Sequence, residues 1–216
     1  MRRRFLTLFA VAMTAITLLI PSFASAAELP EGVILDETQR SARADFKFNR
    51  GCIETHISVN VGIHHQDWID SSTYDSTVGG FTVDQYNTCT EEPVLGIDTY
   101  TEELQADVNQ RFNSASLRGE VMAHNFINEG SDVRVRLNVF WVPAGRVNSH
   151  SESAEITATL PGGEQVPAIQ DFTSYERRAI ALGTITVGNQ FFPLFDNDDD
   201  TVIYGFDGTW TMVAQE

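Results

Sequence analysis

Residues 53–64 read IETHISVNVGIH, and this stretch decides the class of fold. Apolar or β-branched side chains stand at every odd position from Ile53 to Ile63, while polar residues and one glycine fill the even positions. A period of two held over this length is typical of a strand with one buried face. We therefore expect a long β-strand here, with its odd-numbered side chains in a core.

A second alternating stretch, residues 115–142, reads as a hairpin. Odd-numbered apolar residues recur on both sides of Asn128-Glu129-Gly130, which breaks the pattern. Pairing Ile127 with Ser131 leaves a three-residue loop ending in Gly130, a common hairpin form. This register places Val121 opposite Leu137, and a slip by one residue would turn one apolar set away from the core.

Shorter strands are expected at residues 78–86, 150–160, 175–187, 190–195, 202–206 and 209–214. Residues 99–112 fit a helical stripe as well as a strand, and we favour the strand. About ten short strands separated by turn residues predict an all-β fold. An antiparallel β-sandwich is the leading architecture and an antiparallel β-barrel is the alternative. One β domain covering residues 27–216 is the simplest division of the chain.

The first 26 residues have the three parts of a secretory signal peptide. Arg2 to Arg4 precede an uncharged apolar run over residues 5–20, and Ala24-Ser25-Ala26 forms the small-residue site, so we expect cleavage after Ala26. The apolar run is shorter than the ~20 residues of a membrane span, and no second one follows. The start also resembles the twin-arginine export signal, although Thr7 stands where Lys is common; an ordinary export signal is the alternative. The sequence predicts a secreted protein without a membrane span in its mature form.

The charge balance and the two cysteines are consistent with secretion. The chain has 14 Lys+Arg against 30 Asp+Glu, a net charge of -16, and loss of the three signal arginines lowers it to -19. Such an acidic chain is poorly suited to nucleic acid, which needs a basic surface. Cys52 and Cys89 form an even pair in an exported chain, which predicts a disulfide.

Three further segments carry a resemblance. Residues 83–90 read VDQYNTCT, residues 113–117 read NSASL, and a later strand ends in Trp141. Together, over about Gly51 to Val187, they resemble a loose set of uncharacterised exported bacterial β-proteins. The resemblance implies a β fold and export, and because that set has no known activity it implies no reaction.

An acidic stretch near the C-terminus is the sharpest local motif. Read as a calcium loop, Asp196, Asp198 and Asp200 take the first, third and fifth positions, and Asp207 takes the twelfth. Thr201 replaces the glycine needed at the sixth position, and neither flank reads as a helix. Calcium is the only cofactor that the sequence suggests, and a solvated acidic turn is the alternative.

The polar face of the predicted hairpin gathers basic groups in an acidic chain. The residues expected to converge there are Arg118, Glu120, His124, Arg134 and Arg136. Arginine forks suit carboxylates and phosphates, so this face is a candidate site for an anion or an acidic glycan. Charged cross-strand pairs on a solvated sheet face explain the same pattern.

The remaining histidines are weaker candidates. His64-His65-Gln66-Asp67 would hold zinc or copper only if the backbone turned there, because neighbouring strand residues point to opposite faces. Surface histidines near a loop are the alternative.

No motif identifies a reaction. The sequence lacks G-x-S-x-G and H-E-x-x-H, which favours a non-catalytic protein. The leading hypothesis is an exported β-sandwich that binds an unknown extracellular ligand or envelope component. One alternative is a small secreted hydrolase acting on glycans with carboxylates such as Glu120 or Asp132, since sequence spacing fixes no carboxylate separation. Another is a secreted inhibitor whose contact loop is residues 70–77.

Overall fold

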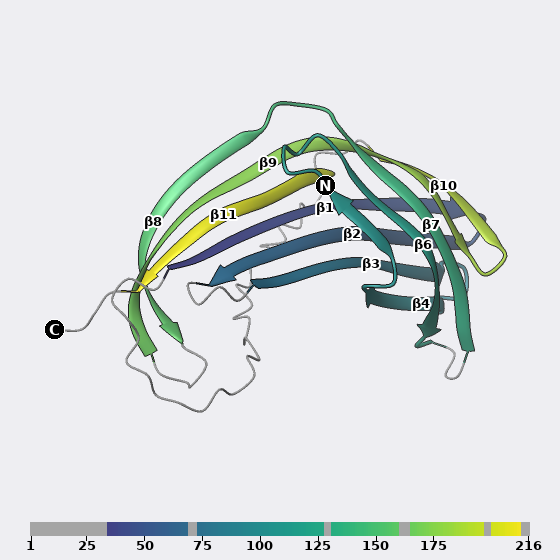
Figure 1. Ribbon diagram of the computed structural model, residues 1–216. Helices are drawn as coiled ribbons and strands as arrows, with labels where there is room; N and C mark the ends of the chain where they lie inside the picture. The colour runs from purple at the N-terminus through teal and green to yellow at the C-terminus, as the bar shows by residue number, and fades with distance from the viewer. Residues whose placement is uncertain (1–33, 69–72, 128–130, 160–164, 197–199, 213–216) are drawn as a thin grey trace, which may run out of the picture.

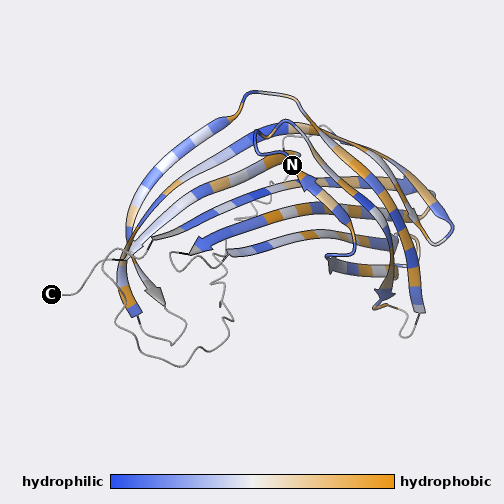
Figure 2. Ribbon diagram, viewed as in Figure 1, coloured by the Kyte–Doolittle hydropathy of each residue, from blue (hydrophilic) through white to orange (hydrophobic). Residues whose placement is uncertain are grey.

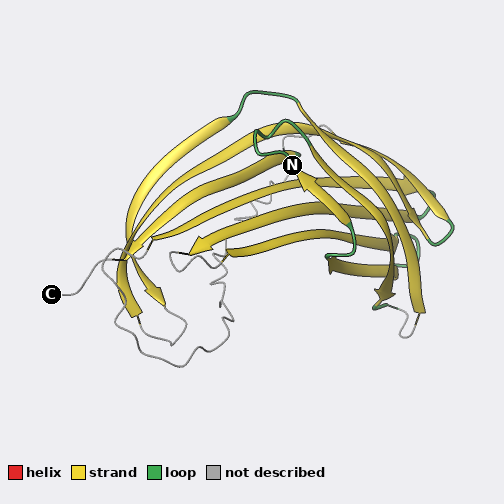
Figure 3. Ribbon diagram, viewed as in Figure 1, coloured by secondary structure: helices red, strands yellow, loops and turns green. Residues whose placement is uncertain are grey.

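Eleven antiparallel strands form one hydrogen-bonded sheet in the computed structural model (Figure 1). The structure describes residues 34–68, 73–127, 131–159, 165–196 and 200–212, so the predicted signal segment 1–26 lies outside it. The strands are β1 (Ile34–Arg50), β2 (Ile53–Trp68), β3 (Thr73–Asn87), β4 (Glu92–Thr101), β5 (Gln105–Val108), β6 (Ala115–Asn125), β7 (Ser131–Pro143), β8 (Asn148–Thr159), β9 (Gln165–Val187), β10 (Gln190–Asp196) and β11 (Val202–Met212). Within these residues there are strands, turns and loops but no helix (Figure 3). The all-β antiparallel fold is confirmed.

The sheet folds over on itself, so that two layers of strands face each other as in a sandwich. From β1 the pairings run through β2, β3, β4, β6, β7, β9 and β11 and return to β1. The link between β4 and β6 is a single residue pair, Ile97 with Asn125, so the circuit is weakest there. The first part of β9 carries β8 as an extra edge strand, and its last part carries β10.

The apolar core lies where the two layers overlap. Trp141, Leu117 and Leu137 are fully buried and face the buried side chains of β1, β2 and β3. Gly79 of β3 lies so close to the facing layer that a Cβ there would sit 2.3 Å from Leu117 Cδ1. The rings of Phe48 and Phe192 meet at 5.3 Å between centroids and join β1 to β10. In Figure 2 the apolar residues are accordingly concentrated at the end of the molecule that contains this core.

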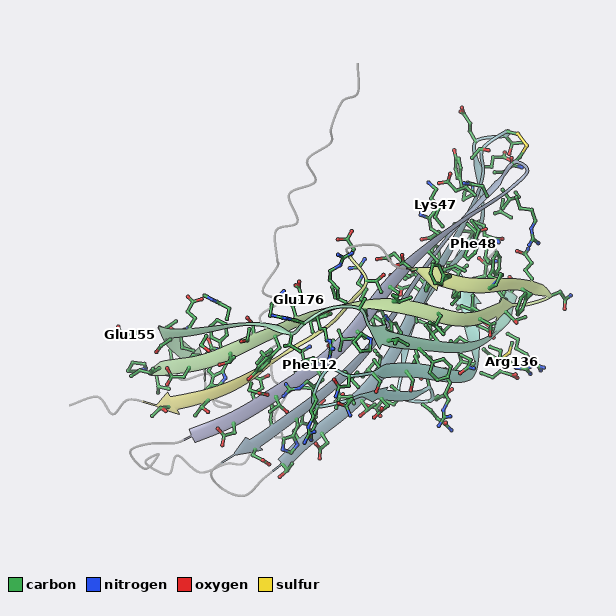
Figure 4. All side chains as sticks on the ribbon, turned by 90° about the horizontal axis from the view of Figure 1, so that it is seen from above. Lys47, Phe48, Phe112, Arg136, Glu155 and Glu176 are labelled. Carbon is green, nitrogen blue, oxygen red and sulfur yellow. A yellow bond between two sulfur atoms is a disulfide. The ribbon has the colours of Figure 1, made fainter. Side chains whose placement is uncertain are left out.

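The predicted disulfide between Cys52 and Cys89 is present, with Cα atoms 5.5 Å apart. It joins the β1–β2 turn to the β3–β4 turn at the tip near Lys47 in Figure 4. The Thr88 amide also donates to the Cys52 carbonyl at 2.8 Å. Closing a loop with a sequence separation of 37 stabilises the fold by about 4 kcal/mol on the chain-entropy estimate.

The β6–β7 hairpin has the predicted faces but not the predicted register. Ser131 pairs with Asn125 rather than with Ile127, and Val121 lies opposite Val135 rather than Leu137. The shift is by two residues, so the apolar sets still face the core. The cause is β4: the Asn125 side chain accepts from the Gly96 amide at 3.3 Å, and the Phe126 amide donates to the Gly96 carbonyl at 3.0 Å. These contacts draw the end of β6 away from β7.

Several strands run well beyond the core. We call the part around the core the closed half, and the extension the open half, which consists of β8 with residues 165–175 of β9, 204–212 of β11, 34–40 of β1, 62–68 of β2 and 73–78 of β3. Figure 1 shows this extension at the end away from β4 and β6. The sequence predicted neither β1 nor the first ten residues of β9, and it began β3 at Val78 instead of Thr73.

Candidate functional site

The face of the sheet that lines the core continues into the open half with different side chains. On β1 the buried residues Phe46, Ala44 and Ala42 are followed on the same face by Arg40, Thr38 and Asp36. Strand alternation fixes this, because every second residue of an uninterrupted strand points to one side. The inner face therefore changes from apolar to polar within one strand.

Two complete rows of polar side chains cross this face of the open half. The pairings align Ser151, Thr173, Asp207, Thr38, His65 and Asp75 in one row and Ser153, Asp171, Thr209, Asp36, Asp67 and Thr73 in the next. We call these residues the polar inner face. Hydroxyl and carboxylate groups make up the whole of it apart from one imidazole. Six strands spaced about 4.8 Å apart give it a width of about 24 Å.

Neighbouring side chains within this face are joined by hydrogen bonds. Ser151 and Thr173 hydroxyls lie 2.8 Å apart, and Thr209 Oγ1 donates to Asp36 Oδ1 at 2.8 Å. Such pairs hold the hydroxyls in fixed orientations while leaving acceptor positions on each oxygen.

His65 is the centre of a charged group at the β2–β3 side of this face. Its Nδ1 lies 2.6 Å from Asp75 Oδ1 and its Nε2 lies 2.9 Å from Asp67 Oδ2. Hydrogen bonds first to Asp75 and then to Asp67 raise the pKa of the imidazole. The same contact with His65, followed by one from Thr73, lowers the pKa of Asp67. The group therefore favours an imidazolium between two carboxylates.

A groove of about 540 Å³ lies at the β8–β9–β11 edge of the polar inner face, opposite the edge that carries His65. Its lining includes Ser151, Ser153, Asp171, Thr173, Asp207 and Thr209 of the polar inner face, together with Glu152, Phe172 and Gly208. The groove thus brings three carboxylates and four hydroxyls to one depression in the sheet.

A cluster at the junction of the two halves separates the core from this polar surface. The Arg40 guanidinium lies 5.0 Å from the Phe112 ring centroid and 5.7 Å from that of Tyr175, and it forms an ion pair with Asp207. Its Nη1 also donates to the Gln39 and Phe206 carbonyls, both at 2.8 Å. Burial, and then Asp207, raise the pKa of Tyr175. We call Arg40, Phe112, Tyr175 and Asp207 the boundary cluster (Phe112 is labelled in Figure 4).

Phe112 reaches this position through an unusual backbone. It adopts φ 55°, in the left-handed region that a bulky residue rarely occupies. Its amide donates to the Asn109 carbonyl at 2.9 Å, and its carbonyl accepts from Arg177 Nη1 at 3.3 Å. The surrounding contacts hold the residue in a strained conformation that caps the core.

The four aspartates of the predicted calcium loop have different surroundings. Asp196 is buried and accepts a hydrogen bond from Thr201, which is fully buried. Asp207 belongs to the boundary cluster, Asp200 is exposed, and Asp198 lies outside the described residues. Among the described residues, no three acidic, histidine or cysteine side chains converge in a way that could hold a metal ion. The calcium site stays a prediction.

The polar face of the β6–β7 hairpin is exposed as predicted, and its two carboxylates form cross-strand pairs with basic side chains. Arg136 Nε donates to Glu120 Oε2 at 2.8 Å, and Arg134 Nε lies 3.4 Å from Glu120 Oε1. His124 Nδ1 lies 3.4 Å from Asp132, while Arg118 faces Asn138 across the pair. Hydrogen bonds from Arg136 lower the pKa of Glu120. The expected residues do gather, but as cross-strand pairs on a surface.

The adjacent histidines of β2 lie on opposite faces, as neighbouring strand residues must. His65 is on the polar inner face, while His64 Nε2 lies 2.5 Å from Glu37 Oε1 on the other side. Glu37 is 6% exposed and also accepts from Gln66 Nε2 at 3.3 Å. These residues form a small buried polar group rather than a joint metal site with His65.

Sequence reasoning missed the polar inner face, although a signal for it exists. Each strand carries polar residues two apart: Asp36 and Thr38, Asp171 and Thr173, or Asp207 and Thr209. Strands were predicted from alternating apolar residues, whereas polar alternation of this kind is also typical of an ordinary loop. Only the pairing of β11 with both β1 and β9 shows that these pairs share one surface.

No protein family model, no curated protein and no solved structure matches the chain. The part of the chain that the structure describes also contains no helix long and apolar enough to cross a membrane. The function is therefore inferred from the side chains and their geometry.

Proposed function

We propose that this chain is an exported, non-catalytic binding protein whose polar inner face contacts an extracellular ligand. The observation that carries the proposal is the pair of uninterrupted polar rows across six strands, next to a groove of about 540 Å³. The side chains of a rigid sheet are held in place before the ligand arrives, which lowers the entropy cost of binding. The predicted signal segment 1–26 supports export.

The chemistry of this face favours a ligand with many hydroxyl groups. Serine and threonine hydroxyls both donate and accept hydrogen bonds, and ionised aspartates accept them. Five aspartates against one histidine make the face acidic, so an acidic glycan would be repelled. We infer a neutral glycan, or one bearing amino groups, as the ligand class.

The positions of the two buried carboxylates weigh against a glycan hydrolase with a buried acid pair. Within the described residues, Glu37 and Asp196 are the buried acids. Glu37 aligns through Gly208 with Phe172 of β9, whereas Asp196 pairs with Ala181, nine residues further along the same strand. That spacing is about 30 Å, far beyond the ~5–10 Å of a glycosidase carboxylate pair.

The test is a glycan array probed with the exported protein. The variant Asp171→Asn/Thr173→Val removes one charge and one hydroxyl from the groove lining, and it should lower affinity for any neutral or amino glycan at least about tenfold. Thr184→Val, on the other side of β9, is the matched control and should bind like the unaltered protein. Equal binding by both variants, or binding restricted to acidic glycans, would contradict the proposal.

Export is tested separately. Mass spectrometry of the protein recovered outside the producing cell should give an N-terminus at Ala27, the residue after the predicted cleavage site. A chain that stays inside the cell with Met1 or Arg2 at its start would refute export and leave the binding test intact.

A further inference from the structure

The outer side of the closed half exposes a group of large apolar side chains. Five of them lie on the neighbouring strands β7, β9 and β10: Phe140 (38% exposed), Val142 (46%), Leu182 (39%), Phe191 (54%) and Phe195 (68%). We call these residues the outer patch. It lies on the opposite side of these strands from the core, because residues 139, 141, 181, 192 and 194 between them are buried.

The pairings make the outer patch continuous. Phe140 lies opposite Leu182, and Leu182 lies opposite Phe195, so three apolar side chains form a ladder across three strands. Val142 pairs with Ile180 in the next row. Scattered apolar residues are normal on a protein surface, but a contiguous group of this size marks a site of interaction.

The charges around the outer patch differ from those of the whole chain. On the outward side of β6, β7, β10 and residues 178–187, four arginines (Arg118, Arg134, Arg136 and Arg178) stand against Glu120 and Asp132. This region is therefore positive by two charges in a chain of net charge -16. Figure 4 shows Arg136 and Glu155 at opposite ends of the molecule. The protein would turn this surface toward a negatively charged partner.

A second copy of the chain is a poorer occupant than an anionic surface. A two-fold contact places the same patch on both partners, and it would bring the two sets of arginines together. Phe195 is the most exposed ring of the outer patch, at 68%. A bilayer surface accepts protruding rings without a preformed pocket, and anionic headgroups complement the arginines.

We propose that the outer patch and its arginines attach the protein to the surface of an anionic lipid bilayer. The phenyl rings enter the interface between headgroups and acyl chains, while the arginines contact lipid phosphates. The polar inner face lies on a different part of the sheet and stays free for its own ligand. This inference does not depend on the proposed glycan binding.

The test is co-sedimentation of the exported protein with two kinds of vesicle, one of phosphatidylcholine alone and one with equal parts of phosphatidylglycerol. Binding is expected to the anionic vesicles. The variant Phe191→Thr/Phe195→Thr should lower the partition coefficient at least about tenfold, because two rings no longer leave water. Arg118→Gln/Arg134→Gln should lower it several-fold and weaken its dependence on salt.

Tyr100→Thr is the matched control, because it removes a ring that is 63% exposed on β4, outside the outer patch. It should bind vesicles like the unaltered protein. Failure of the unaltered protein to bind anionic vesicles, or equal binding by the Phe191→Thr/Phe195→Thr variant, would overturn the proposal. Equal binding to both kinds of vesicle would overturn its anionic part. Dimers in solution that the double phenylalanine variant abolishes would assign the patch to a second copy instead.

Discussion

The closed and open halves of this protein share five strands, β1, β2, β3, β9 and β11, and differ in what lies on their inner face. In the closed half the inner residues of β1 and β2 include Ala44 and Val59, which are fully buried. In the open half the corresponding residues are Thr38 and His65, which lie in the polar rows. The ladder of backbone hydrogen bonds continues through both halves without a break.

This difference shows how a sheet can extend beyond its own core. Burial of apolar side chains stabilises the closed half, whereas the open half gains little from burial on its inner face. It stays ordered because its strands are anchored in the closed half and paired along their length. The boundary cluster lies where stabilisation by apolar burial ends and stabilisation mainly by strand pairing begins.

The largest contrast is expected for equivalent truncations in the two halves. Trp141→Ala removes a fully buried ring from the closed half and should cost about 3–5 kcal/mol of unfolding free energy. Ser151→Ala, an exposed inner residue of the open half, should change it by less than about 0.5 kcal/mol. Urea unfolding of both variants measures the contrast, and similar losses would show that the open half contributes as much packing as the core.

The disulfide should account for the next largest effect. Replacing both cysteines, Cys52→Ser with Cys89→Ser, should cost about 2–4 kcal/mol, because the bridge constrains the unfolded chain. Since the bridge joins two turns of the closed half, amide hydrogen exchange should accelerate most around those turns. A variant with an unchanged denaturation midpoint would contradict this role.

Loss of the boundary cluster should have an intermediate effect. Arg40→Met keeps an apolar stem near Phe112 and Tyr175 but removes the ion pair with Asp207 and two hydrogen bonds to carbonyls. We expect a cost of about 1–3 kcal/mol, since hydrogen bonds from a charged group are lost.

Arg43→Met is the matched control for this change. Arg43 pairs with Asp45 on the same strand, but both side chains are about half exposed, so we expect a cost below about 1 kcal/mol. Equal effects of the two substitutions, measured by urea unfolding, would show that the boundary cluster adds nothing beyond a surface ion pair.

The smallest effect is a dependence of stability on pH that belongs to the open half. Because the pKa of His65 is raised, its contribution is complete below the ordinary value of 6.5 and is lost as pH rises through the higher folded value. Because the pKa of Asp67 is lowered, its contribution is complete above the ordinary value of 3.8 and is lost as pH falls through the lower folded value. Their joint contribution is greatest between these two values.

A thermal melting series from pH 5 to pH 9 tests this, with His65→Asn as the comparison. The difference in midpoint between the two proteins should shrink as pH rises above 6.5. A difference that stays constant over the series would show that the imidazole is not charged in the folded state.

The closed half could be predicted from the sequence because its chemistry alternates. Ile57, Val59 and Val61 stand at odd positions with polar residues between them, and all three are buried as expected. The disulfide could be predicted from an even cysteine count in a chain with a predicted export signal. The loop of the β6–β7 hairpin could not be placed, since the contact between Gly96 and Phe126 that shifts it joins segments far apart in the sequence.

The open half escaped prediction for the opposite reason. Residues 34–41 and 165–174 carry polar side chains on both faces or mix the two kinds, so no period of two in hydropathy marks them as strands. Their conformation is set by pairing with β2 and β11, a tertiary effect that propensity does not contain. The candidate site was missed with them, because Asp36, Thr38, Asp171 and Thr173 all lie in these two segments.

The position of β11 has a consequence for how the chain reaches this structure. β11 ends at Met212, close to the C-terminus, yet it lies between β1 and β9 in the interior of the sheet. The meander of β1 to β4 joins neighbours in sequence and can pair early, whereas Ile34 and Thr211 must find each other across almost the whole chain. Such distant pairing is slow, because the entropy cost of closing a long loop must be met before the contacts that compensate for it can form. We therefore expect folding to end with insertion of the last strand, so a nascent or truncated chain would expose the edges of β1 and β9 to aggregation.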